Sequence, residues 1–186
     1  MTESDAYLPG PPNATVERKE GDKWTLVLVR DLRHPPDKVW RALTEPAELR
    51  EWAPFEAGGS LANAGATVTL TWVGTGRPVE TAVTRAEAPR ALEYGDLRWE
   101  LEAAGGGTRL TLWASIDRRF VSMGAAGWHI ALDVLDRLLG GTPIARIAGG
   151  EAMRFAGWQR LNEEYARQFG VVAPNWPAKA AGPESS

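Results

Sequence analysis

Apolar and polar residues alternate over a series of short segments between residues 67 and 116, and this alternation constrains the fold more than any other feature of the sequence. Val68, Leu70 and Trp72 are separated by threonines. Similar segments follow at residues 79–88, 91–94, 97–103 and 108–116. Residues two apart lie on the same face of a strand. The region therefore predicts an antiparallel meander, with the three glycines at 105–107 as a hairpin turn.

A strand and several helices flank the meander. Residues 23–32, "KWTLVLVRDL", are rich in β-branched and aromatic side chains and predict a strand. The prolines at 35, 36 and 46 mark the starts of two short helices after it. Apolar residues recur every three or four positions in 127–139 and 151–170, which predicts helices there. The glycine-flanked stretch 140–150 leaves open whether these form one helix or two. This order predicts an α+β fold.

The ends of the chain differ from its centre. Residues 1–21 contain several prolines and charged residues and show neither a strand nor a helix period, and the last residues, "PAKAAGPESS", are similar. We therefore expect a flexible N-terminal arm over residues 1–21, one domain over 22–170 and a C-terminal tail over 171–186.

Composition excludes several classes of protein. The net charge is -3 and there is no run of lysine or arginine, which argues against nucleic-acid binding. The chain has no cysteine and only two histidines, His34 and His129, so no metal site is predicted. No Gly-x-Ser-x-Gly motif occurs, and we predict no catalytic residue and no cofactor. No apolar stretch has the length of a signal peptide or a membrane span, which favours a cytoplasmic protein.

Three segments carry a resemblance to a known family: "PPDKVWRALTEPAELREW" at 35–52, "GWHIALDVLDRLLGG" at 127–141 and "GWQRLNEEYARQFG" at 157–170. They resemble the START-like superfamily, also called SRPBCC or helix-grip, and most closely bacterial homologues of the heat-shock-protein-90 ATPase activator. The resemblance covers about residues 23–170. It implies a curved antiparallel sheet that wraps a long C-terminal helix, with a cavity between them that holds an apolar ligand in many relatives. It also implies a chaperone as a candidate partner.

Aromatic residues are the candidates for a ligand site. Trp72, Tyr94 and Trp99 share the phase of the apolar residues in their strands, so they are expected on the concave face, with Trp52 and Phe55 of the second helix nearby. Plain core filling explains the same pattern equally well. The full predicted ligand-binding set is Trp52, Phe55, Leu70, Trp72, Tyr94, Trp99, Leu112, Trp128 and Leu132.

Three further residues have a predicted position. His129 and Asp133 fall in the polar stripe of the helix over 127–139, which favours a solvent-exposed pair four residues apart. The alternative is a place at the mouth of the cavity. Trp113 is out of phase with the apolar residues of its strand and is expected on the outer face. It is a candidate interface residue, covered by a second copy in a homodimer or by the N-terminal arm.

Three functions agree with these observations. The favoured one is a protein without catalytic activity that binds an apolar or amphipathic small molecule in the cavity. The second is a module that regulates a chaperone or binds another protein through its surface. The third is an enzyme of the cyclase or dehydratase type, with His129 and Asp133, or Tyr94, as acid or base.

Overall fold

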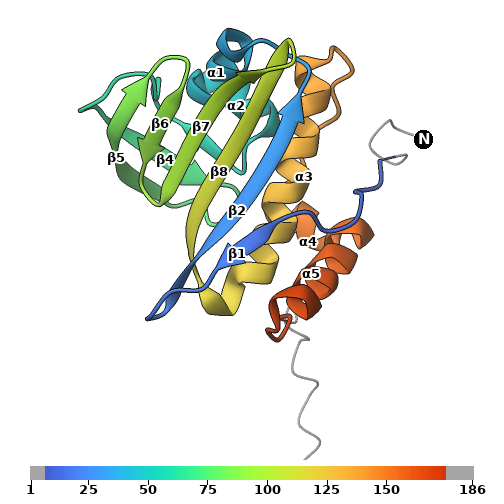
Figure 1. Cartoon of the computed structure of the whole chain (residues 1–186). Coiled ribbons are helices and arrows are strands. Elements are labelled where there is room, and N and C mark those ends of the chain that lie inside the picture. The colour runs from blue at the N-terminus through green and yellow to red at the C-terminus, as the bar shows by residue number, and fades with distance from the viewer. Residues whose placement is uncertain (1–6, 175–186) are drawn as a thin grey trace, which may run out of the picture.

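The sheet holds eight antiparallel strands in the order β1-β2-β8-β7-β6-β5-β4-β3 (Figure 1). The computed structural model describes residues 7–174. The strands are β1 (Thr15–Glu17), β2 (Lys23–Leu32), β3 (Phe55–Ala57), β4 (Thr67–Trp72), β5 (Pro78–Glu87), β6 (Ala91–Tyr94), β7 (Leu97–Ala104) and β8 (Gly107–Asp117). From β3 to β8 each strand pairs with the next, so the predicted meander is confirmed. The first long strand, β2, pairs with the last strand, β8, over ten residue pairs.

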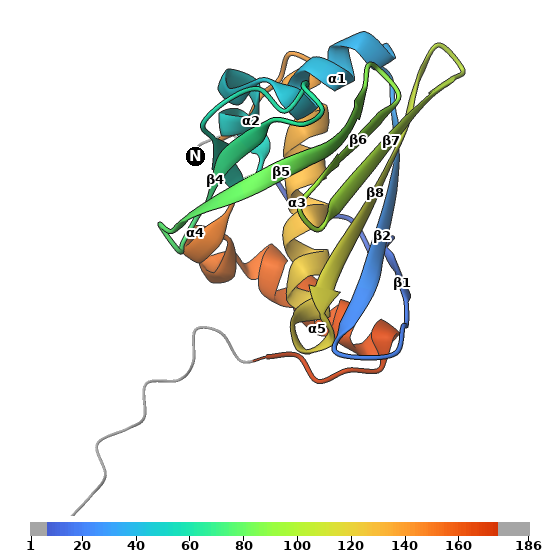
Figure 2. The ribbon, with the colours of Figure 1, turned by 90° about the vertical axis from the view of Figure 1, so that its left-hand side faces the viewer.

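The helices lie on the concave side of the sheet. They are α1 (Pro36–Thr44), α2 (Pro46–Trp52), the 3-10 turn η2 (Arg118–Phe120), α3 (Val121–Leu139), α4 (Gly149–Arg154) and α5 (Ala156–Phe169). The sheet curls around α3, as Figure 2 shows, and the predicted helix-grip arrangement is confirmed. Proline opens both α1 and α2, as expected, because its fixed φ suits the first helical turn. No helix within residues 7–174 has the length and apolar character needed to cross a membrane.

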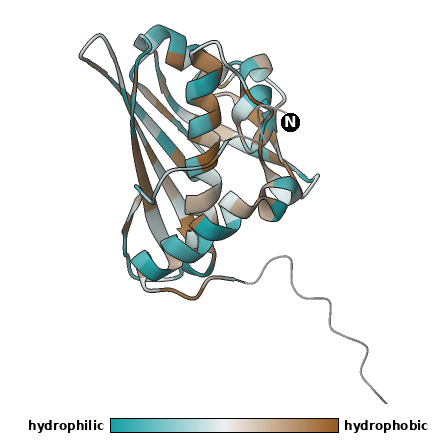
Figure 3. Cartoon of the chain, turned by 90° about the vertical axis from the view of Figure 1, so that its right-hand side faces the viewer, coloured by the Kyte–Doolittle hydropathy of each residue, from teal (hydrophilic) through white to brown (hydrophobic). Residues whose placement is uncertain are grey.

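The C-terminal helical region is not continuous. The helix α3 ends at Leu139, and residues 140–148 contain no regular element before α4 begins. Gly141 adopts a φ of +80°, in the left-handed region that favours glycine. The chain then turns back so that α5 packs beside α3, where Ser122 Oγ donates a hydrogen bond to Asn162 Oδ1 at 2.7 Å. Figure 3, which views this side, shows hydrophilic residues along the outward surface of α5.

The N-terminal segment differs from the prediction of a flexible arm. Residues 15–17 form the edge strand β1, and the side chains of Tyr7 and Ala14 are 3% and 1% exposed. The backbone N–H groups of Asn13 and Ala14 donate to Tyr165 Oη on α5, at 3.0 and 3.2 Å. Such bonds between side chains and backbone leave no period in the sequence, so pattern reasoning missed them. Residues 1–6, and 175–186 of the predicted tail, lie outside the described residues.

Candidate ligand-binding cavity

Six aromatic side chains from six different elements form a continuous series of contacts on the concave side. In order of contact they are Tyr94, Phe55, Trp72, Trp128, Trp99 and Trp52, with neighbouring ring centroids 5.1 to 6.4 Å apart. Most of the pairs meet edge to face, an arrangement that aromatic rings prefer. The series joins the meander to α2 and α3 and fixes the distance between sheet and helix.

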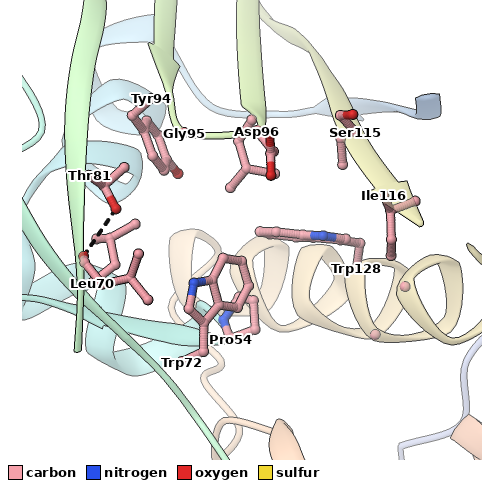
Figure 4. Close-up of a pocket in the computed structure, with 15 residues that line it drawn as sticks. Pro54, Leu70, Trp72, Thr81, Tyr94, Gly95, Asp96, Ser115, Ile116 and Trp128 are labelled. Carbon is pink, nitrogen blue, oxygen red and sulfur yellow. Dashed lines mark hydrogen bonds between the residues drawn. The ribbon is translucent and has the colours of Figure 1, made fainter. Parts of the chain in front are cut away.

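A cavity of about 400 Å³ lies beside this series, between the sheet and α3 (Figure 4). Its walls are mainly apolar and come from Leu70 and Trp72 of β4, Tyr94 of β6, Ile116 of β8 and Trp128 of α3. Sites for small molecules in proteins have volumes of about 300 to 1,000 Å³ and walls of this kind. The space is therefore large enough for a small organic molecule.

Two glycines of α3 face the cavity and keep the helix from filling it. A Cβ added at Gly127 would have no heavy atom within 4 Å, so the space beside it is open. A Cβ added at Gly124 would lie 2.5 Å from Ile116 Cδ1, so this glycine lets the isoleucine pack against the helix. Glycine inside a helix costs about 1 kcal/mol relative to alanine. The cavity is thus kept open at a cost to the stability of α3.

The polar groups of the cavity are few. Tyr94 Oη accepts a hydrogen bond from Trp99 Nε1 at 3.1 Å. Burial raises the pKa of Tyr94 far above its ordinary value, so the phenol stays protonated. Asp96 lies at the rim, where its carboxylate is 3.3 Å from Lys23 Nζ and largely exposed. The interior is therefore apolar and neutral, and the ionised groups are at its edge.

The predicted ligand-binding residues divide into two groups. Four of them, Leu70, Trp72, Tyr94 and Trp128, line the cavity. The others are buried in the core around it and do not line it: Trp52, Phe55, Trp99, Leu112 and Leu132. Phe55 belongs to β3 and not to the second helix. Strand phase identifies the inner face, but whether a residue meets a neighbour or an open space depends on tertiary packing.

Some cavity residues were not predicted. Gly127 opens the helix predicted over 127–139 and Gly124 lies before it, whereas α3 begins at Val121 and contains both. Two glycines three positions apart inside a helix are a signal of close packing or open space. Thr81, Asp96 and Ser115 also line the cavity. Polar residues in strands and turns are common, and nothing in their local pattern distinguishes these three.

The prediction that His129 is solvent-exposed is wrong, and so is its alternative at the cavity mouth. The side chain is 2% exposed and lies against α5, away from the cavity lining, with Nδ1 2.8 Å from Tyr165 Oη. Burial, together with Arg30 and Arg160, lowers the pKa of His129 to about 4. The part of the polar stripe that holds His129 and Asp133 is covered by α5 and the N-terminal segment, which a helical wheel of α3 alone does not show.

Asp133 is also not at the cavity. Its carboxylate accepts a hydrogen bond from Tyr7 Oη of the N-terminal segment, and His129 Nε2 is 3.7 Å from the same oxygen. Burial raises the pKa of Asp133, although the Tyr7 hydrogen bond opposes this. Arg137 lies over the Tyr7 ring, 5.1 Å from its centroid. Asp133 thus holds the N-terminal segment on α3, while His129 contacts α5.

Trp113 lies on the outer face of β8, paired with Val27 of β2 and Arg98 of β7, as strand alternation predicts. The Arg98 guanidinium covers the ring, with Cζ 4.3 Å from its centroid, and the side chain is half-buried. Glu17 and Lys19 line the same surface hollow, so the N-terminal segment lies beside the ring. Its role in a homodimer stays a prediction.

Comparison with known sequences gives one family. The sequence model described as "Activator of Hsp90 ATPase homolog 1-like protein" matches residues 33–140, which is more than half of the chain. The matched region runs from the turn before α1 through the meander to the end of α3, and so includes the cavity. No curated protein sequence matches the chain.

Solved structures with the same fold include several bacterial proteins. CalU16 from Micromonospora echinospora has a TM-score of 0.64 and 22% identity, with 86% of this chain and 98% of that chain covered. EF2215 from Enterococcus faecalis, a conserved protein of unknown function, has a TM-score of 0.64 and 20% identity, with 86% and 92% covered. DynU16, a protein of the dynemicin biosynthetic locus, has a TM-score of 0.56 and 24% identity, with 66% and 49% covered. At these identities the likeness concerns the fold.

Proposed function

The chain belongs to the family of Activator of Hsp90 ATPase homolog 1-like proteins, and from this premise we propose that it binds an apolar or amphipathic small molecule between the sheet and α3. The observation that carries the proposal is the cavity of about 400 Å³, walled by Trp72, Tyr94 and Trp128. Moving apolar surface of a ligand from water into such a space is favourable by about 25 cal/mol for each Å² buried.

Binding without catalysis fits the cavity better than acid–base chemistry does. His129 and Asp133 are engaged on the other side of α3, with Tyr165 and Tyr7. Asp96, whose carboxylate is the one in the lining among residues 7–174, is at the exposed rim and pairs with Lys23. An acid or base has to reach the proton it transfers and have a pKa near the working pH, and the raised pKa of Tyr94 lies far from neutrality.

Substitution of Gly127 by leucine tests this proposal. The new side chain enters the open space beside Gly127, so we expect the variant to bind N-phenyl-1-naphthylamine at least about tenfold more weakly than the wild type. Leucine also favours the helix over glycine by about 1 kcal/mol, so the melting temperature should not fall. Titration of the probe, followed by its fluorescence increase, measures the affinity, and circular dichroism measures the fold.

The matched control is Glu163→Leu, which adds leucine at an exposed position of α5. It should bind the probe as the wild type does. The proposal fails if the wild-type protein does not bind the probe, or if folded Gly127→Leu protein binds it with unchanged affinity.

A further inference from the structure

The hydroxyl proton of Tyr94 has no acceptor within the part of the chain that the structure describes. The side chain is 1% exposed, and its oxygen accepts the bond from Trp99 Nε1. Its own O–H donates no hydrogen bond to any of residues 7–174. A buried donor without a partner is costly. Tyr94 lines the cavity, and Figure 4 shows its ring beside the open space, so an acceptor can reach the hydroxyl only from there.

Other donors face the same space. Trp72 and Trp128 line the cavity, and neither indole N–H has an acceptor among the residues described. By contrast, the hydroxyl of Thr81 is already bonded to the Val79 carbonyl at 3.1 Å. The unused hydrogen-bonding capacity of the aromatic wall therefore consists of donors, which a ligand can satisfy only with an acceptor atom.

We propose that the cavity selects neutral apolar ligands that carry a carbonyl oxygen, and that this oxygen accepts a hydrogen bond from Tyr94 Oη while the rest of the ligand lies against Trp72 and Trp128. This rests on the proposed function and adds the chemical class of the ligand. Aromatic ketones are the simplest members of that class.

The charges around the cavity favour a neutral carbonyl over a carboxylate. Among residues 7–174 no lysine or arginine belongs to the lining, so a carboxylate placed at Tyr94 would be buried without a counter-ion, which is costly. The protonated phenol of Tyr94, by contrast, can donate to a neutral oxygen without burying a charge.

Trp99 is a positioning residue in this arrangement. It does not line the cavity, but its N–H holds the Tyr94 oxygen from the core side at 3.1 Å, which leaves the hydroxyl proton for the cavity side. A hydroxyl that accepts one hydrogen bond is also a somewhat stronger donor in the next. The aromatic series thus orients the donor as well as forming the wall.

Two ligands of nearly equal shape test the proposal: 2-acetylnaphthalene, which has a carbonyl, and 2-isopropenylnaphthalene, which has a methylene group in its place. Their affinities are measured by displacement of N-phenyl-1-naphthylamine. In the variant Tyr94→Phe we expect the ketone to bind about three- to tenfold more weakly, the effect of one lost hydrogen bond. The alkene should bind Tyr94→Phe and wild type within about twofold, which also shows that the variant is folded.

Two further measurements separate a hydrogen bond from a change of shape. The carbonyl stretch of bound, carbon-13-labelled ketone should lie at lower wavenumber in the wild type than in Tyr94→Phe. The matched control Tyr7→Phe removes a tyrosine hydroxyl on the other side of α3 and should leave the ketone-to-alkene affinity ratio unchanged. If Tyr94→Phe weakens both ligands equally, or neither, the inference is overturned while the proposed function stands. A wild-type protein that binds none of the three compounds overturns both.

Discussion

Replacement of Trp99 by alanine should lower the free energy of unfolding by about 4 kcal/mol. The side chain is fully buried, contacts Trp52 and Trp128 edge to face, and donates its N–H to Tyr94. Truncation of a buried tryptophan or phenylalanine removes its transfer free energy and leaves a cavity, at a cost of about 3 to 5 kcal/mol. Urea unfolding followed by circular dichroism measures the change without depending on tryptophan fluorescence.

Trp113→Ala provides the matched comparison. Trp113 is on the outer face of the neighbouring strand and is covered mainly by one arginine side chain, so the same truncation should cost less than about 1 kcal/mol. Equal losses for the two variants would show that the assignment of inner and outer faces is wrong.

The protein should lose about 3 kcal/mol of stability between pH 7 and pH 4 because of His129. Its pKa is about 4 in the folded chain, against 6.5 for an unperturbed histidine. A depressed pKa means that the unfolded state takes up the proton first. The stability is therefore fully present above pH 6.5 and is lost as the pH falls towards 4. Chemical unfolding at a series of pH values measures how the free energy of unfolding depends on pH.

Burial is the main reason why His129 stays unprotonated, and its contact with Tyr165 fits the neutral form. Tyr165 Oη accepts the N–H groups of Asn13 and Ala14, and two acceptors lie within reach of its own proton: His129 Nδ1 at 2.8 Å and Asn13 Oδ1 at 3.3 Å. The contact with His129 is the shorter one, and a hydroxyl that donates to Nδ1 pairs with the neutral tautomer that carries its proton on Nε2. In that arrangement a proton added at Nδ1 of His129 would change this nitrogen from an acceptor into a donor, so that two donors, Nδ1–H and the Tyr165 O–H, would face each other. Arg30 and Arg160 add repulsion of a positive charge.

Two variants isolate this contribution. His129→Gln should remove most of the loss between pH 6.5 and 4, whereas His34→Gln, which keeps His129, should retain it. Asp133 acts in the opposite direction, because its raised pKa lets the folded state bind a proton before the unfolded state does. Asp133 is present in both the wild type and His129→Gln, so its effect cancels to first order when the free energies of unfolding of the two proteins are subtracted at each pH. If the free energy of unfolding depends on pH equally in the wild type and in His129→Gln, then His129 is not a neutral buried histidine.

The fold could be predicted from the sequence because each long element has its own local signal. Alternation in 67–72 and 97–103 gives β4 and β7, and the proline at 36 gives the start of α1. The strands that were missed, β1 and β3, have three residues each, too few for a period to appear. The N-terminal segment was misjudged because its order comes from α5, at the opposite end of the chain.

The candidate site could be predicted only in part. The alternation of residues along the strands correctly placed Trp72, Tyr94 and Trp99 on the inner face, but of these three only Trp72 and Tyr94 line the cavity. The position of His129 was predicted wrongly because a helical wheel shows only which residues lie on the polar side of a helix. A polar side chain there can face water or another polar group, such as the Tyr165 hydroxyl. Only the packing of α5 on α3 decides between these two environments.

The attachment of the N-terminal segment also bears on the order in which the chain folds. Tyr7 binds Asp133, and Asn13 and Ala14 bind Tyr165, across 126 to 152 positions of sequence. Contacts between distant residues require long loops to close, which slows folding. During synthesis the N-terminus leaves the ribosome first, and domains begin to fold as they emerge. Residues 7–14 are therefore made early, but Tyr7 acquires its partner only after α3 has been released, and Asn13 and Ala14 only after α5 has.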